Sequence, residues 1–239
     1  VDLAYSKKQF ELAVRLLEIA QCFAPQEPEV LHHLSPLYRI IGQWEKSIVA
    51  ARLYCSLAEQ SASKVFANHL LLRALLGAGG HWQEALEAFH NHELLISSLL
   101  QEHPTNLGFA NILRLYLLGY FAPYFRDDPR RNHFFQNQLA QFCQDNIAVY
   151  ANGAVERYQQ SHATRSSRIQ PSRPLKIGYL SHCFKTHSVG WLARWLIKYH
   201  DREKFNIFGY FVPYQESDDP LQAWYVDRVD RAYRGGVDG

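Results

Sequence analysis

The sequence lacks several features that would assign a function directly. It contains no methionine, even at position 1, so we expect a piece of a longer protein. Its 25 basic and 23 acidic residues give a formal charge of only +2, which offers no bulk electrostatic reason to bind nucleic acid or an anionic membrane. No stretch approaches the ~18 consecutive apolar residues that a membrane helix needs, and no signal peptide is visible.

Motifs for common cofactors are also missing. The four cysteines lie far apart, with no CxxC pair and no zinc-finger spacing, which favours reduced, mostly buried thiols and a cytoplasmic location. The sequence has neither the GxGxxG fingerprint of nicotinamide and flavin sites nor the GxxxxGK[ST] of a P-loop. These absences leave no evidence for a nucleotide cofactor or a structural metal.

The 239 residues contain 47% hydrophobic and 20% charged residues, enough apolar material for a core in one large or two small domains. Apolar residues recur at helical spacing from residue 1 to about residue 161, and prolines and glycines fall between these segments. One predicted buried face consists of Leu12, Leu16, Ile19 and Phe23. Another consists of Leu86, Phe89 and Ile96, with Glu93 as its polar exception.

A faint internal repeat runs through this helical region. Phe10, Trp44 and Trp82 are each followed three residues later by a small residue, namely Ala13, Ser47 and Ala85. The spacing is close to the ~34 residues of tetratricopeptide (TPR) repeats, in which a small residue lets two helices approach and an aromatic residue fills the corner between pairs. Leu31, Leu34, Ser35 and Tyr38 match the packing positions of a first helix. An ordinary helical bundle with aromatic corners is the alternative.

The pattern changes after residue 161. Residues 162–174 are polar and basic with prolines near their end, which predicts a solvated linker. In residues 175–239, an apolar run at 175–180, a helix whose apolar face is Trp191, Leu192, Trp195, Leu196 and Tyr199, and an aromatic run at 205–212 predict a right-handed βαβ unit. A further helix is expected around Leu221 to Val229, and two strands alone would leave the sheet unfinished.

The loop from Ser181 to Ser188 follows the first predicted strand, where parallel sheets bind ligands. We expect Ser188 to cap the next helix, whose free N–H groups could bind a diphosphate. Lys185, Thr186 and Ser188 are therefore candidate substrate-binding residues and His187 a candidate catalytic residue. The competing interpretation is that His187 only caps or packs against the helix.

Other reactive residues have simpler explanations. His182 and Cys183 match no known catalytic pair, and Cys183 is expected to be a small buried residue. The pairs His32–His33 and His90–His92 should diverge on a helix, so we predict no metal site. Asp218 and Asp219 are expected to form a surface turn before Pro220.

The second half resembles the start of the catalytic region of protein O-GlcNAc transferases and SPINDLY-like proteins. The resemblance rests on four groups of residues: Leu175–Ser181, Phe184 with His187 and Ser188, His200–Phe205, and Asp218–Asp219. In that family TPR repeats precede the catalytic lobes, in the same order as here. The expected fold is therefore an α-helical TPR-like superhelix followed by the start of an α/β Rossmann-like lobe, the N-terminal lobe of a GT-B fold.

The resemblance implies an inverting glycosyltransferase that needs no metal. It would move GlcNAc, or a related sugar, from UDP-GlcNAc or GDP-fucose to Ser or Thr of acceptor proteins bound by the repeats. The family's loop histidine corresponds to His187 at the active-site cleft. No nucleic acid or membrane partner is expected, and a homodimer is left open.

This sequence departs from the family pattern at two loop positions. Cys183 stands where the family has Asp, and Ser188 where it has Pro. The sugar-nucleotide site belongs mainly to a second lobe, so these residues alone are expected to be inactive. The alternative function is a non-enzymatic TPR-type scaffold that carries a glycosyltransferase remnant.

Overall fold

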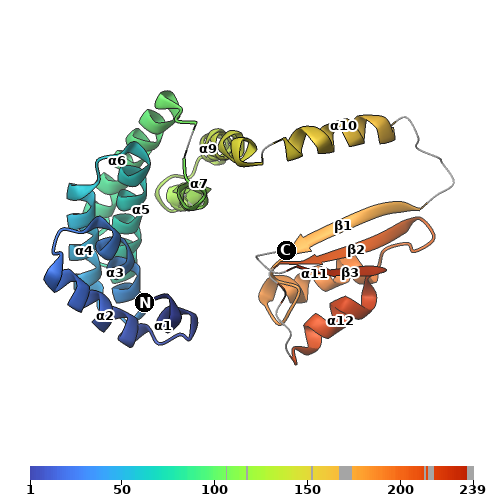
Figure 1. Ribbon diagram of the computed structural model, residues 1–239, viewed down its shortest axis with the longest axis horizontal. Coiled ribbons are helices and arrows are strands. Elements are labelled where there is room, and N and C mark those ends of the chain that lie inside the picture. Colours follow the sequence, from blue (N-terminus) through green and yellow to red (C-terminus); the bar gives the residue numbers. More distant parts are fainter. Residues whose placement is uncertain are drawn as a thin grey trace. The chain divides into compact units, whose positions relative to one another are not determined.

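The computed structural model describes residues 1–105, 107–116, 118–151, 153–166, 174–212, 214 and 218–235. The chain divides into two compact units, Val1–Gln160 and Ser161–Gly239, and each is described here by itself (Figure 1). None of the described helices combines the length and apolar character that crossing a bilayer requires.

The first unit is helical, as predicted, and its described residues contain no strand. Its elements are α1 (Asp2–Ser6), α2 (Phe10–Phe23), α3 (Pro28–Ile40), α4 (Trp44–Leu57), α5 (Ser61–Ala78), α6 (Trp82–Glu102), α7 (Phe109–Tyr116), the 3₁₀ helix η1 (Leu118–Phe121), α8 (Ala122–Phe125) and α9 (Pro129–Tyr150). A further helix, α10 (Ala154–Ser166), crosses the division between the units.

The predicted repeat corresponds to successive helix pairs, visible in Figure 1 as α3 with α4 and α5 with α6. The helices α2, α4 and α6 begin at the three aromatic residues of the repeat, Phe10, Trp44 and Trp82. The small residues one turn later, Ala13, Ser47 and Ala85, are fully buried. At Ser47 the close approach is direct, because its hydroxyl donates a hydrogen bond of 2.7 Å to the Ser35 carbonyl in α3.

Each corner tryptophan contacts a helix that follows its own in the chain, the next helix for Trp44 and a later one for Trp82. The Trp44 ring lies so close to Gly77 of α5 that a Cβ there would stand 3.0 Å from Trp44 Cζ3. The Trp82 ring stacks on Phe125 of α8, with ring centroids 5.2 Å apart. Gly42 has a φ of +77° at the corner before Trp44, a conformation that glycine adopts without steric cost.

The predicted buried face of α2 is wrong. Leu12, Leu16, Ile19 and Phe23 are exposed, Phe23 by 85%, whereas Ala13, Val14 and Leu17 are buried. The helix carries apolar residues around most of its circumference, so helical spacing alone does not tell which stripe faces α3. The small residue Ala13 decides the matter, because it allows the closest approach of the two helices.

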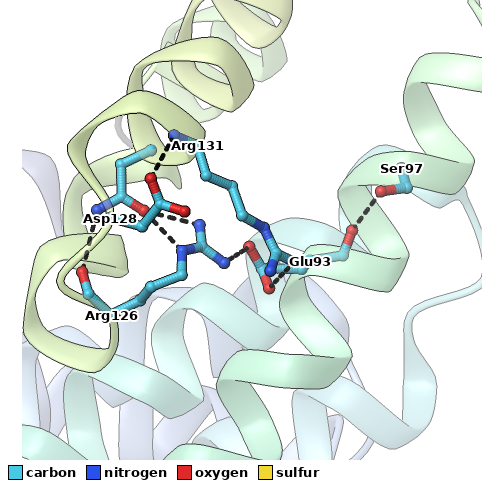
Figure 2. Close-up of polar contacts among 6 residues, drawn as sticks. Glu93, Ser97, Arg126, Asp128 and Arg131 are labelled. Carbon is cyan, nitrogen blue, oxygen red and sulfur yellow. Dashed lines mark hydrogen bonds and ion pairs between the residues drawn. The ribbon is translucent and has the colours of Figure 1, made fainter.

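The polar exception in α6 has a structural role. Glu93 forms an ion pair of 2.7 Å with Arg126 and a second contact of 3.5 Å with Arg131, and the Glu93 and Arg126 side chains are both largely buried (Figure 2). Arg126 also donates to the side-chain oxygen of Asn132, and Asp128 caps α9 by accepting from the Arg131 amide. This network fastens the start of α9 to α6, and a charge-assisted contact of this kind is stronger than a neutral one.

The predicted start of the linker at residue 162 is wrong. Residues 162–166, assigned to the linker from composition, continue the helix α10. Polar and basic side chains are compatible with a helix when they are exposed, and the described side chains of α10 are all partly or fully exposed. Composition therefore predicted the end of this helix too early. Residues 167–173 of the predicted linker lie outside the described residues.

The second unit holds the predicted βαβ arrangement. Strands β1 (Leu175–Ser181) and β2 (Phe205–Phe211) pair in parallel from Leu175 opposite Phe205 to Ser181 opposite Phe211. Helix α11 (Ser188–Lys198) connects them, and α12 (Pro220–Arg228) follows. A third strand, β3 (Arg231–Arg234), pairs in parallel with β2 and was not predicted, because four residues with exposed arginines at both ends carry no apolar signal.

Both helices pack on one face of this sheet, as Figure 1 shows. The core between them consists of Phe184, Ile197, Ile207, Phe211, Leu221 and Tyr225. Three of these residues belong to β2 or the loop after β1, so the core fixes that loop against the sheet.

Candidate functional site

The candidate site is the loop between β1 and α11, at the carboxyl end of the parallel strands. This is the place where the sequence predicted it, and parallel sheets bind their ligands at this edge. Lys185, Thr186, His187 and Ser188 are all exposed here, while Cys183 and Phe184 are buried.

Phe184 and Gly190 fix the path of the loop. The Phe184 ring packs against Tyr225, with centroids 4.7 Å apart, and against Phe211 at 5.3 Å. A Cβ on Gly190 would stand 2.2 Å from the Lys185 carbonyl oxygen and 2.5 Å from that of Cys183, distances that no real side chain tolerates. Only a residue without a side chain lets the loop fold back over the start of α11.

Asp219 ties the loop to α12. Its carboxylate accepts from the Thr186 amide at 2.8 Å and from the Thr186 hydroxyl at 3.0 Å, and it also caps α12 by accepting from the amides of Leu221 and Gln222. Burial alone would raise the pKa of Asp219, but the hydrogen bonds from Gln222, Thr186 and Leu221 outweigh it and hold the pKa below its usual value. Asp219 is therefore more than a residue of a surface turn.

His187, not Ser188, caps α11. The His187 Nδ1 atom accepts a hydrogen bond of 3.1 Å from the Val189 amide, so the prediction of a Ser188 cap is wrong. The His187 backbone is extended and lies directly before the first helical turn, which places its ring rather than the Ser188 hydroxyl next to the free amide.

This cap also fixes the chemistry of the neutral imidazole. Because Nδ1 accepts a hydrogen bond, the proton of the neutral ring lies on Nε2. In this conformation the Nε2 atom of the neutral ring can donate a hydrogen bond and has no lone pair with which to take a proton. The geometry therefore suits His187 to position an oxygen atom better than to act as a general base.

The remaining loop residues are engaged locally. Cys183 is buried, as predicted, and its Sγ lies 3.2 Å from His182 Nε2. The Ser181 hydroxyl accepts from the Cys183 amide at 2.9 Å. The His182 and His187 rings lie 6.3 Å apart between centroids. Among the described residues, Lys185 has no ion-pair partner, so its positive charge on this loop is not compensated.

One histidine pair outside this loop does not behave as the sequence predicted. The rings of His32 and His33 do not diverge, because their centroids lie 4.0 Å apart. Both rings approach the same Glu29 oxygen, at 3.3 Å and 3.4 Å, and these three residues form a group that could hold a metal ion. Arg114 also lies 3.8 Å from Glu29 and supplies a positive charge at the same carboxylate. This local cation disfavours a divalent metal there.

No protein-family model matches the sequence, and no curated protein matches it. Among solved structures, the chain is similar to a mutant O-GlcNAc transferase from Thermobaculum terrenum, with a TM-score of 0.53 and 20% sequence identity over 98% of this chain. The chain spans 39% of that protein's length.

The fold is that of an O-GlcNAc-transferase-like helical repeat region followed by the beginning of an α/β lobe. This confirms the predicted fold class. Identity at this level is evidence about the fold, so the chemistry has to be argued from the residues of the loop.

The sequence did not reveal the contact between Asp219 and Thr186. The Asp-Pro pair at residues 219–220 is a typical helix start and could have identified Asp219 as a cap. Its second partner lies 33 residues earlier in the chain, and no local pattern predicts that contact. The side chains of His187, Lys185 and Ser188 therefore form the exposed side of the loop, whereas Thr186 is hydrogen-bonded to Asp219.

Proposed function

We propose that this chain is part of a protein O-glycosyltransferase of the O-GlcNAc transferase or SPINDLY kind. The parent enzyme transfers GlcNAc or a related sugar from a nucleotide sugar to Ser or Thr of proteins, with inversion, between two GT-B lobes. The observation that carries the proposal is an exposed His187 at the carboxyl end of a parallel strand, in a chain whose fold matches an O-GlcNAc transferase over 98% of its length.

In this proposal the loop residues act on the acceptor and the diphosphate. His187 positions the acceptor hydroxyl by donating a hydrogen bond from Nε2, as its cap geometry favours. Lys185 supplies positive charge for the departing diphosphate, and Ser188 and Thr186 complete the polar wall. The donor is UDP-GlcNAc or GDP-fucose, and neither a metal nor a cofactor is part of the proposal.

The helical unit would bind acceptor proteins, because stacked helix pairs present an extended surface to a peptide. We place the protein in the cytoplasm, since its four cysteines are free. A homodimer remains compatible with the proposal, and no nucleic acid or membrane partner is part of it.

A non-enzymatic scaffold is the second candidate function. One observation favours it. Thr186 donates its hydrogen bonds to Asp219, and the His187 Nδ1 atom accepts from the Val189 amide, so both groups are already bound within the protein. A loop that serves only to connect β1 and α11 would look the same.

The deciding experiment measures transfer by the natural polypeptide that carries this chain. It is incubated with labelled UDP-GlcNAc or GDP-fucose and a protein extract, and donor binding is followed by calorimetry. We expect transfer, and we expect His187→Ala to reduce it by about 10²-fold, because the acceptor hydroxyl is no longer positioned. His90→Ala, which removes an exposed histidine of α6, should leave transfer unchanged.

A second variant distinguishes a role of His187 in the reaction from its role as the cap of α11. His187→Ser retains an oxygen that can cap α11 but removes the imidazole. If this variant is as inactive as His187→Ala while both remain folded, the imidazole acts on the reaction. Full activity of His187→Ser would reduce His187 to a cap, and absence of transfer from either donor would favour the scaffold.

A further inference from the structure

A cavity of about 550 Å³ lies in the helical unit. Helices α3 and α5 contribute Arg39, His69 and Arg73 to its wall, and η1 and α8 contribute Tyr120, Phe121 and Tyr124. Its volume is in the range of pockets that hold small ligands or single side chains.

Two arginines without a counter-ion dominate this cavity. Among the described residues, no ion pair involves Arg39 or Arg73, although most other arginines of the helical unit have an acidic neighbour. Both side chains are half-buried, and the Arg39 Nε atom is buried without a hydrogen-bond partner in the described structure. Burial and the neighbouring Arg39 charge lower the pKa of Arg73, so each guanidinium destabilises the other.

Gly77 makes room for one of them. A Cβ at this position would stand 3.5 Å from Arg39 Cδ and 3.0 Å from the Trp44 ring. The aliphatic part of the Arg39 side chain therefore crosses α5 at Gly77, next to the Trp44 ring. A half-buried pair of like charges costs free energy unless an anion compensates it.

Other hydrogen-bonding groups surround the arginines. His69 is only 3% exposed, and its Nδ1 atom has no hydrogen-bond partner among the described residues. Burial, His92 and Arg73 lower the pKa of His69 to about 3, so the ring is neutral near pH 7 and offers a neutral donor. The hydroxyls of Tyr120 and Tyr124 lie 3.5 Å apart at the exposed rim and can also donate.

We propose that this cavity binds an anionic side chain of a partner peptide, a carboxylate or a phosphate monoester, between Arg39 and Arg73. The guanidinium fork fits both groups by paired hydrogen bonds. The walls also contain Leu76, Phe121 and the tyrosine rings, which would contact the carbon atoms of a peptide side chain. A lone inorganic ion would leave these apolar walls unfilled.

This inference deepens the proposed function, because it names the chemistry of the protein partner that the helical unit recognises. It involves none of the residues of the β1–α11 loop. A binding assay without any sugar donor therefore tests it separately from sugar transfer.

The test uses the 239-residue chain and fluorescence anisotropy. The probes are a fluorescein-labelled Gly-Ser peptide with spaced glutamates, the same peptide with phosphoserines in their place, and the same peptide with glutamines. We expect the glutamate or the phosphoserine peptide to bind at least about tenfold more tightly than the glutamine peptide, a difference of about 1.4 kcal/mol. Binding of the glutamate peptide identifies carboxylates as sufficient, and binding of the phosphoserine peptide alone identifies phosphate as the source.

The double variant Arg39→Gln with Arg73→Gln should remove this preference. Arg15→Gln is the matched control for loss of a basic residue of the helical unit, since Arg15 is exposed on α2, and should change affinity by less than about twofold. If the double glutamine variant is misfolded by circular dichroism, Arg39→Lys with Arg73→Lys keeps the charge and loses the forks, and it should weaken binding several-fold. Equal affinity for all three peptides, or binding that these variants leave unchanged, would overturn the proposal.

Discussion

The helical unit and the α/β unit differ in how they cover their apolar surfaces. In the helical unit, from α1 to α6, each helix packs on the next one along the chain, and the unit forms two continuous cores. In the α/β unit one small core lies between the sheet and its two helices, while the other side of α11 is exposed. The exposed large residues there are Val189, Trp191, Leu192, Trp195, Leu196 and Tyr199, so the apolar face predicted for this helix does not pack on the core, which receives Ile197 instead.

The physical reason is the range of the contacts. Stacked helix pairs bury their apolar faces against helices that are close in sequence, whereas parallel strands and their covering helices depend on partners distant in sequence. The two units also differ in what they bury. The helical unit encloses the histidines His32, His69 and His92, while the described histidines of the α/β unit are at least partly exposed.

Acid should unfold the helical unit first. Burial is the main cause that lowers the pKa of His32 and His92 to about 4 and that of His69 to about 3. The unfolded chain takes up these protons near pH 6.5, so stability is complete above that pH and falls as the pH drops towards 4. We expect a loss on the order of 5 kcal/mol by about pH 4.5.

Hydrogen-exchange mass spectrometry at several pH values measures the two units separately. The α/β unit should keep its protection to lower pH, because the lowered pKa of Asp219 gives a contribution that is lost only below about pH 4. His92→Gln should reduce the pH dependence of the helical unit, and His90→Gln, at an exposed site, should not. The same acid sensitivity in both units would contradict the prediction.

Truncating a leucine to alanine should lower the free energy of unfolding strongly at a buried position and little at an exposed one. Leu34 is fully buried, and Leu34→Ala should lower the free energy of unfolding of the helical unit by about 3.5 kcal/mol, through lost burial and an unfilled cavity. Leu192 is 74% exposed, and Leu192→Ala should cost less than about 0.5 kcal/mol. Denaturant titration followed by circular dichroism gives both values, and similar losses would show that α11 is covered in solution.

The loop after β1 should not tolerate a side chain at Gly190. Gly190→Ala should destabilise the α/β unit by about 2.5 kcal/mol, because the new methyl group meets two backbone carbonyl oxygens that cannot both move. Gly108→Ala is the control, since nothing lies within 4 Å of a Cβ there. Thermal unfolding monitored by tryptophan fluorescence measures both, and an unchanged melting temperature for Gly190→Ala would contradict the loop path.

The smallest effect is expected at Asp219. Asp219→Ala removes the cap of α12 and both contacts with Thr186, which should cost about 1 kcal/mol above pH 5. The difference from the unchanged protein should shrink as the pH falls through the lowered pKa of Asp219, because protonation weakens the same contacts. Asp218→Ala is the control at the neighbouring exposed residue, and equal losses from both variants would rule out the specific tie.

Much of the architecture could be predicted from local patterns. The repeat of an aromatic residue followed by a small one located three helix starts, at Phe10, Trp44 and Trp82. The aromatic and apolar runs located β1, β2 and their parallel pairing across α11. These features depend on spacings of a few residues, which a single sequence records directly.

The structure of the candidate loop could be predicted only in part. The loop and its exposed His187 could be located, because the carboxyl end of a parallel strand is a general place for ligands. The cap on α11 was assigned to Ser188 instead of His187, because the choice depends on the backbone angle where the loop enters the helix.

What the sequence determined by itself is which segments are helices and strands, in what order, and which small residues let them pack, because these depend on local spacing and size. Tertiary structure alone decided which stripe of α2 is buried, that Asp219 holds Thr186, and that Arg39 and Arg73 share one cavity. Each of these depends on contacts between segments distant in sequence, whose geometry is fixed only when the surrounding helices and strands have packed.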